Sequence, residues 1–155
     1  LERHKLSPGS FCLEITESAI MDDPVRAQAT LERLSAMGVD LSIDDFGTGY
    51  SSLAYLKRLP VNELKIDKSF VLNMEHDVGD TKIVRSTIDL GHNMGLRVVA
   101  EGIESEAVWR LLADLGCDQG QGYFMSRPIP GDQLIGWLEK WQAPITVSDG
   151  MVGIT

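Results

Sequence analysis

Short apolar stretches alternate with longer segments of helical periodicity along most of the chain. The apolar stretches are rich in β-branched residues and end at polar or glycine-containing turns, which is typical of strands. The segments between them repeat apolar residues at helical spacing and end at glycine or proline. The predicted strands are residues 11–16, 40–43, 63–67, 97–101 and 119–125, and the predicted helices are 25–37, 51–59, 81–94, 105–115 and 131–141.

Strands that alternate with helices at this spacing indicate parallel βα units and an α/β fold. Neither a GxGxxG fingerprint after the first strand nor a GxxxxGK[ST] loop is present, which disfavours a nucleotide-binding doubly wound sheet. We therefore predict a (β/α)8 TIM-type barrel. A full barrel needs eight strands and ~250 residues, so about five βα units predict a partial barrel that lacks its N-terminal strands. Residues 142–155 carry no periodic pattern and are expected to form a flexible tail.

Composition narrows the possible partners. The chain has 155 residues, of which 43% are hydrophobic, and its net charge is −9. This acidity disfavours DNA or RNA as a partner, because phosphate backbones are bound mainly by Lys and Arg. No apolar run approaches the ~20 residues of a membrane span. Cys12 and Cys117 suggest neither a disulfide framework nor a zinc site, and we expect a cytoplasmic location.

Acidic residues recur where the predicted strands end. Glu14, Asp44 with Asp45, Asp67 and Glu101 lie near or just past the ends of four successive strands. Any one of them alone is typical of a solvated loop charge or a helix N-cap. Together, at one mouth of a barrel, they would repel one another unless cations compensated them. Hard divalent ions with oxygen ligands, Mg²⁺ or Mn²⁺, are the natural compensation, and two such ions suit phosphodiester hydrolysis.

Lys65 stands two residues before Asp67, so the two side chains point to the same face of a strand. A lysine inside a barrel needs anionic neighbours, and it could serve only as a structural counter-charge. The functional alternative is a cation that orients the attacking water or stabilises charge developing on a phosphate.

Five ordered motifs carry a family resemblance. They are EITES at residues 14–18, DDFGTGYSSL at 44–53, KIDKSF at 65–70, VAEGIE at 99–104 and QGY at 121–123. They resemble the successive signatures of EAL domains, which are cyclic di-GMP phosphodiesterases. The resemblance assigns residues 1–141 to the C-terminal portion of such a domain.

The resemblance implies hydrolysis of cyclic di-GMP to linear pGpG with two Mg²⁺ or Mn²⁺ ions. By the same resemblance Glu14, Asp44, Asp45, Asp67 and Glu101 are metal ligands, with Glu101 as ligand or base. Lys65 resembles the residue that positions the hydrolytic water, and Gln121 resembles a polar group that supports it. Glu104 resembles an anchor for the loop at residues 46–53, which in the family couples homodimer contacts to metal binding.

The Glu-Ala-Leu signature that names the family is absent, as is an Asn ligand expected on an earlier strand. Both would belong to the three N-terminal units inferred to be missing, so we expect the isolated chain to be inactive. Three alternatives stay open: a receptor that binds cyclic di-GMP without cleaving it, a Mg²⁺-dependent enolase-like lyase, and a regulatory or dimerisation segment. The presence of every visible acidic ligand favours hydrolysis over a receptor, and the DDFGTG loop speaks against the lyase.

Overall fold

Five parallel strands form one sheet in the computed structural model, which describes residues 1–49 and 53–144. The strands are β1 (Cys12–Thr16), β2 (Asp40–Phe46), β3 (Glu63–Ile66), β4 (Arg97–Ala100) and β5 (Gln119–Gly120). Each pairs with the next in the order β1-β2-β3-β4-β5. A doubly wound sheet reverses its strand order at a switch point, whereas a barrel adds each strand on the same side. The described strands follow the barrel order, which confirms the predicted α/β fold.

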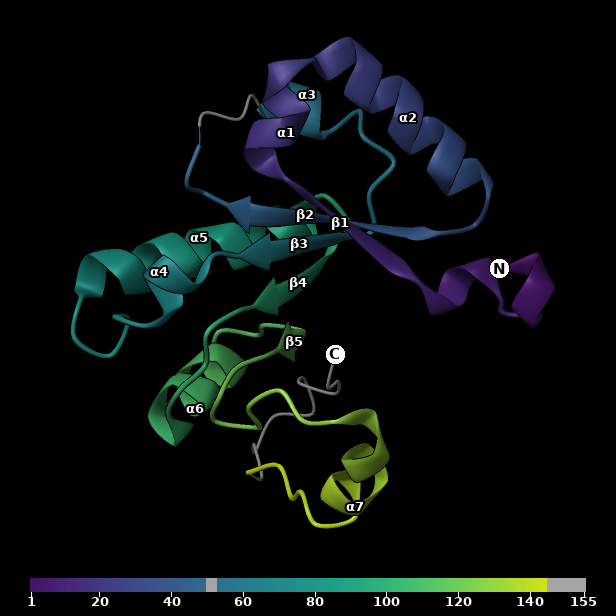
Figure 1. Cartoon of the computed structure of the whole chain (residues 1–155). Coiled ribbons are helices and arrows are strands. Elements are labelled where there is room, and N and C mark those ends of the chain that lie inside the picture. The colour runs from purple at the N-terminus through teal and green to yellow at the C-terminus, as the bar shows by residue number, and fades with distance from the viewer. Residues whose placement is uncertain (50–52, 145–155) are drawn as a thin grey trace.

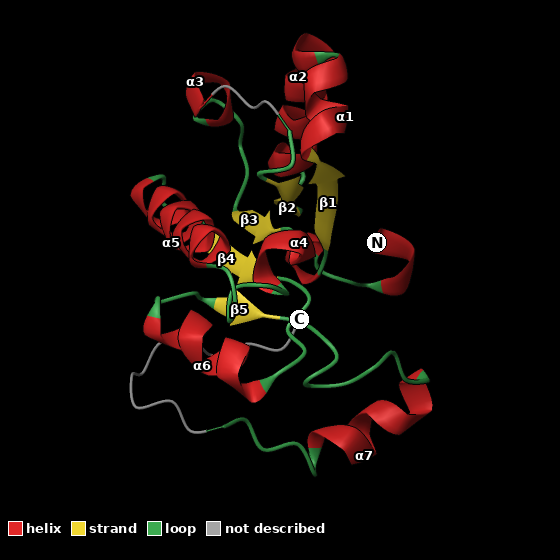
Figure 2. Cartoon of the chain, turned by 90° about the vertical axis from the view of Figure 1, so that its left-hand side faces the viewer, coloured by secondary structure: helices red, strands yellow, loops and turns green. Residues whose placement is uncertain are grey.

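Helices cover one side of this curved sheet. The longest are α2 (Pro24–Ala36), α5 (Val78–Asn93) and α6 (Glu106–Asp114). Figure 2 looks onto the strand ends and shows α2, α5 and α6 around the outside of the curve. The shorter helices are α1 (Glu17–Asp22), α3 (Leu53–Leu56), α4 (Lys68–Val71) and α7 (Leu134–Leu138), with 3-10 turns at Glu2–His4, Pro8–Ser10 and Gly131–Gln133. In Figure 1, α7 stands apart from the sheet. Among the described helices, none has both the length and the apolar character to span a bilayer.

The alternation of side chains in β3 separates the core from the inner face. Leu64 and Ile66 are fully buried and join a hydrophobic cluster that includes Val84 and Ile88 of α5. Lys65, between them, points to the opposite face because successive side chains on a strand alternate. Burial against the helices therefore fixes which face of the strand carries the lysine.

Two short helices were not predicted from the sequence. Helix α1 begins directly after β1, where the Thr16 hydroxyl accepts a hydrogen bond from the Ala19 amide. Helix α4 begins directly after β3, where the Asp67 carboxylate accepts from the Ser69 amide at 2.9 Å. Such N-caps satisfy backbone donors that the first helical turn leaves free. Both helices are too short for a 3.6-residue periodicity to be visible.

Other boundaries differ from the sequence prediction. The predicted helix at 51–59 is shorter in the structure: α3 ends at Leu56 and residues 57–59 form a turn, whereas residues 51 and 52 lie outside the described residues. The predicted strand 119–125 shortens to Gln119–Gly120 and then turns, and the predicted helix 131–141 becomes a 3-10 turn followed by α7. The expected tail at 142–155 lies outside the described residues from position 145 onward.

Candidate metal and active site

Carboxylates from neighbouring strands converge at the C-terminal edge of the sheet. One oxygen atom each from Asp44, Asp45 and Glu101 can lie within 4.8 Å of the others, the one such group among the described residues. Asp44 and Asp45 end β2, whereas Glu101 directly follows β4. Glu14 of β1 and Asp67 after β3 flank this group. The edge predicted to be acidic therefore collects side chains from four strands.

A break in strand pairing lets two consecutive carboxylates serve one site. Adjacent residues of a regular strand point to opposite faces. Between β2 and β3 the register shifts between Ile43 and Phe46, and Asp45 adopts a left-handed φ of 55°. Asp45 is one of only two described non-glycine residues with positive φ. The Thr48 hydroxyl donates to the Asp45 carbonyl at 2.8 Å and supports this bend. The bulge turns Asp45 towards the edge that Asp44 already faces.

Lys65 lies at the centre of the acidic cluster. Its Nζ is 2.6 Å from Glu101 Oε1, 2.7 Å from Glu14 Oε1 and 3.4 Å from Asp44 Oδ1. Its side chain is 4% exposed, so the ammonium group is held out of water by these partners. Three carboxylates contact this one ammonium, and those of Asp45 and Asp67 lie beside them. This excess of negative charge favours further cations.

The surroundings shift the pKa values of both partners in the Lys65–Glu101 pair. Burial acts to lower the pKa of Lys65, but its hydrogen bonds to Glu101 and Glu14 outweigh burial and hold the pKa above its ordinary value. The pKa of Glu101 is raised by burial, and the charges of Asp44 and Glu14 add to that rise against the opposing effect of Lys65. Lys65 is thus a fixed cation, and Glu101 is a carboxylate whose affinity for a proton is increased.

Asp45 and Asp67 face each other with opposite shifts. Burial raises the pKa of Asp45, and the neighbouring charges of Asp44 and Asp67 add to the rise. Burial acts to raise the pKa of Asp67 as well, but hydrogen bonds from the Ser69 side chain and backbone outweigh it and lower that pKa. The Ser69 amide and the Ser69 hydroxyl both donate to Asp67 Oδ1.

Gln121 and two glycines set the position of Glu101. The Gln121 Nε2 atom donates to Glu101 Oε1 at 2.6 Å, the same oxygen that Lys65 contacts. A Cβ atom at Gly122 would lie 2.1 Å from the Ile103 carbonyl oxygen, so only glycine lets these two backbones approach. Gly102 has a φ of 74° and no room for a side chain against Lys68. The segments after β4 and β5 are therefore held together beside the site.

Glu17 contacts the loop that follows Asp45, although no role was predicted for it from the sequence. Its side chain is buried, and its Oε2 atom accepts hydrogen bonds from the Gly47 amide at 3.0 Å and the Gly49 amide at 3.3 Å. Among the described residues, Glu17 therefore holds the loop that follows Asp45. Glu104 lies elsewhere, in a pocket beside Glu101, and its predicted anchoring of the loop stays a prediction. The available signal in the sequence was the spacing of Glu14 and Glu17, which recurs in Glu101 and Glu104.

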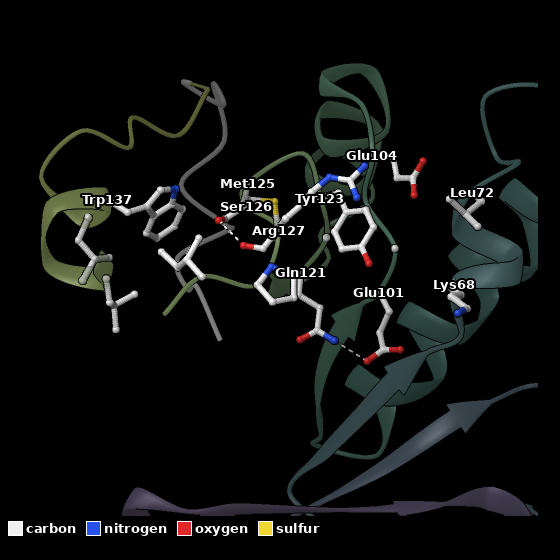
Figure 3. Close-up of a pocket in the computed structure, with 16 residues that line it drawn as sticks. Lys68, Leu72, Glu101, Glu104, Gln121, Tyr123, Met125, Ser126, Arg127 and Trp137 are labelled. Atoms are coloured by element: carbon white, nitrogen blue, oxygen red, sulfur yellow. Dashed lines mark hydrogen bonds between the residues drawn. The ribbon is translucent and has the colours of Figure 1, made fainter. Parts of the chain in front are cut away.

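A pocket of about 810 Å³ opens next to Glu101 and Gln121 (Figure 3). In Figure 3, Glu101 and Gln121 meet at one side of the pocket, while Tyr123, Arg127 and Glu104 line the other parts. The Arg127 guanidinium lies 4.6 Å from the centre of the Tyr123 ring, in cation–π contact. The apolar lining of the pocket includes Leu72, Met125, Ile129, Leu134, Trp137 and Leu138. Cavities of this size accommodate small organic ligands.

The donor set fits a hard divalent cation. Carboxylate oxygens are the ligands that Mg²⁺ and Mn²⁺ prefer. Two oxygens on opposite sides of a Mg²⁺ ion are about 4.2 Å apart at its usual bond lengths. The oxygens of Asp44, Asp45 and Glu101 lie within 4.8 Å of one another, so small side-chain rotations bring them close enough to bind one ion.

Comparison with known proteins gives a consistent family match. The model of the EAL domain matches residues 1–128. Over 135 residues the chain is 52% identical to the bifunctional diguanylate cyclase/cyclic di-GMP phosphodiesterase MucR of Pseudomonas aeruginosa, covering 87% of this chain and 20% of MucR. It is 44% identical to the signaling protein YkoW of Bacillus subtilis over 133 residues, which are 86% of this chain and 17% of YkoW. The chain thus spans about a fifth of these relatives.

Solved structures match the fold as well. A MucR phosphodiesterase structure in complex with c-di-GMP superposes with a TM-score of 0.84 at 52% identity, over 86% of this chain and 54% of that chain. A manganese/cy-diGMP complex of Klebsiella pneumoniae BlrP1 superposes with a TM-score of 0.77 at 33% identity, over 83% of this chain and 33% of that chain. The chain spans about half of the MucR structure.

Proposed function

This chain belongs to the EAL domain family, and from that premise we propose that its acidic cluster is the divalent-cation site of a cyclic di-GMP phosphodiesterase that releases linear pGpG. One observation carries the proposal: carboxylates from β1, β2 and the end of β4 converge around the buried ammonium of Lys65, which itself stands on β3. A structural ion pair needs one carboxylate for each cation. A cluster with this excess of carboxylates is suited to binding metal ions beside a phosphate.

Asp44, Asp45 and Glu101 would hold a cation, with Glu14 and Asp67 as flanking ligands. Mg²⁺ is usually bound through only one or two carboxylates, so five carboxylates suit two ions better than one. The cations would be Mg²⁺ or Mn²⁺, and the manganese complex of BlrP1 supports this choice. Such ions polarise the phosphoryl oxygens and lower the pKa of a bound water.

The chain's own residues would orient the reaction. Lys65 offers N–H donors at the centre of the cluster and would position the attacking water. Glu101 would act as a cation ligand or as the base that accepts the proton of that water, and Gln121 would hold Glu101 in place through the 2.6 Å hydrogen bond. The adjacent pocket would bind part of the dinucleotide, and the similar MucR structure in complex with c-di-GMP supports this choice of ligand.

Metal binding is the property of the isolated chain that tests the proposal. Isothermal titration of the chain with Mn²⁺ should show binding that Asp44→Asn weakens by at least tenfold, with an unchanged circular dichroism spectrum. Ser105→Ala, at the N-terminus of α6, is a matched polar substitution outside the cluster and should leave the affinity unchanged. Wild-type chain that binds no Mn²⁺ would contradict the proposed site.

Hydrolysis is tested separately. We expect the isolated chain to release little or no pGpG, since it spans only part of the matched phosphodiesterase structure. In a complete EAL domain that contains this segment, Asp44→Asn should reduce Mn²⁺-dependent release of pGpG by orders of magnitude. Binding of cyclic di-GMP in Ca²⁺ without any cleavage in Mn²⁺ would instead favour the receptor alternative.

The remaining proposals concern assembly and setting. We propose a homodimer through the loop after Asp45, within a cytoplasmic signalling protein. Leu53, which follows this loop, is an exposed apolar side chain that such a contact could cover. Leu53→Glu should then lower the apparent mass in sedimentation, whereas Val25→Glu, at another exposed apolar residue, should not.

A further inference from the structure

Asp67 differs from the other acidic residues of the cluster in how it is held. It contacts neither Lys65 in an ion pair nor the Glu101–Gln121 pair among the described residues. Its Oδ1 atom instead receives two hydrogen bonds from a single residue, the amide and the hydroxyl of Ser69. Asp67 is 9% exposed and faces the carboxyl group of Asp45.

Two donors on one oxygen fix the carboxyl group in rotation as well as in position. Turning the group about its last side-chain torsion, whose energy profile is broad for Asp, would move Oδ1 away from both Ser69 donors. Both Ser69 donors go to Oδ1, so neither occupies Oδ2. The carboxyl group is therefore oriented before any ion arrives.

We propose that Ser69 is a positioning residue that orients Asp67 against Asp45 for divalent-cation binding. This inference rests on the proposed function. Removal of a group that hydrogen-bonds a metal ligand, without itself touching the metal, typically weakens metal affinity by about 10- to 100-fold. Ser69 acts through Asp67 and contacts no substrate.

The exposure of Ser69 makes the inference testable. Its side chain is exposed, so Ser69→Ala opens no cavity in the core. That variant keeps the amide bond to Oδ1 and loses only the hydroxyl bond. Ser69→Thr retains the hydroxyl. Ser105→Ala is the matched control, because Ser105 likewise lies at the start of a helix and donates its hydroxyl to a carboxylate, that of Glu75 at 2.8 Å.

The experiment is isothermal titration of the full chain and these three variants with Mn²⁺. We expect Ser69→Ala to bind Mn²⁺ about 10- to 100-fold more weakly than wild type. Ser69→Thr should restore the affinity, and Ser105→Ala should keep the wild-type value. Thermal unfolding without metal should show a larger loss of stability for Ser105→Ala, which also loses the hydrogen bond that caps α6, than for Ser69→Ala, which keeps its amide bond to Asp67.

The possible results distinguish a failure of the positioning role of Ser69 from a failure of the proposed metal site. Wild-type affinity in Ser69→Ala would overturn the positioning role while leaving the metal site in place. An equal loss of affinity in Ser105→Ala would also overturn it, because the effect would then follow helix stability. A wild-type chain that binds no Mn²⁺ would overturn the proposed function and the inference together.

Discussion

Removal of the Glu17 carboxylate should release the loop that follows Asp45. Glu17 Oε2 accepts the amides of Gly47 and Gly49, at 3.0 and 3.3 Å, from a side chain that is only 3% exposed. In Glu17→Ala both amides lose their acceptor. In Glu17→Gln the side-chain oxygen can still accept them, but it carries no charge.

The size of the effect follows from these two bonds. A hydrogen bond to a charged group contributes about 1.5–3 kcal/mol. The longer bond falls at the weak end of that range, and an exposed loop can turn a released amide to water. We therefore expect Glu17→Ala to lower the free energy of loop opening by about 2–4 kcal/mol. This corresponds to a roughly 30- to 1000-fold larger opening equilibrium. Glu17→Gln should lose only about half as much, because neutral hydrogen bonds are weaker.

Hydrogen exchange at the Gly47 and Gly49 amides measures this opening directly. Exchange rates report local opening free energies when closing is faster than exchange. Glu104→Ala is the control, since the family resemblance assigns the role of loop anchor to Glu104. Unchanged protection of the Gly47 amide in Glu17→Ala, together with rapid exchange in Glu104→Ala, would refute the reasoning and return the anchor to Glu104.

Three further changes have expected outcomes. Lys65→Met leaves Glu14, Asp44 and Glu101 without their shared ammonium, so the free energy of unfolding measured in urea should fall by about 3 kcal/mol. Mn²⁺ should restore more stability to this variant than to wild type. If Lys65→Met without metal were as stable as wild type, the ion-pair account would be contradicted. Gly122→Ala places a Cβ atom 2.1 Å from the Ile103 carbonyl oxygen and should lower the free energy of unfolding by at least about 2 kcal/mol. Gly136→Ala meets no neighbour and should be neutral or slightly stabilising in thermal denaturation. The pKa of Asp67 is lowered in the folded chain, so its contribution to stability is present above the unfolded pKa, near ~4, and is lost as pH falls through the folded value. The difference in unfolding free energy between wild type and Asp67→Asn should therefore be constant near neutral pH and shrink below pH ~4. A difference that grew on acidification would reverse the assigned direction of the pKa shift.

The strand–helix order was predictable because its signals are local. The first four predicted strands and the three long helices occupy the predicted segments, with ends that differ by a few residues. Proline at the start of α2 and glycine after α2, α5 and α6 mark boundaries within a single turn. The short helices α1 and α4 were missed, since one or two turns carry no measurable period. The strand at 119–125 was overextended because its apolar residues after Gly122 belong to a turn.

The sequence by itself determined which residue types stand at the strand ends and, through parallel βα units, at which edge of the sheet they gather. It could not determine which of them touch. The shared contacts of Lys65, the bulge that turns Asp45 beside Asp44, and the hydrogen bonds from Gly47 and Gly49 to Glu17 all depend on how strands pair in register. Register joins residues that are far apart in the chain, and a change of one position would turn a side chain to the opposite face. Tertiary packing alone sets that register, and with it the arrangement of charge at this site.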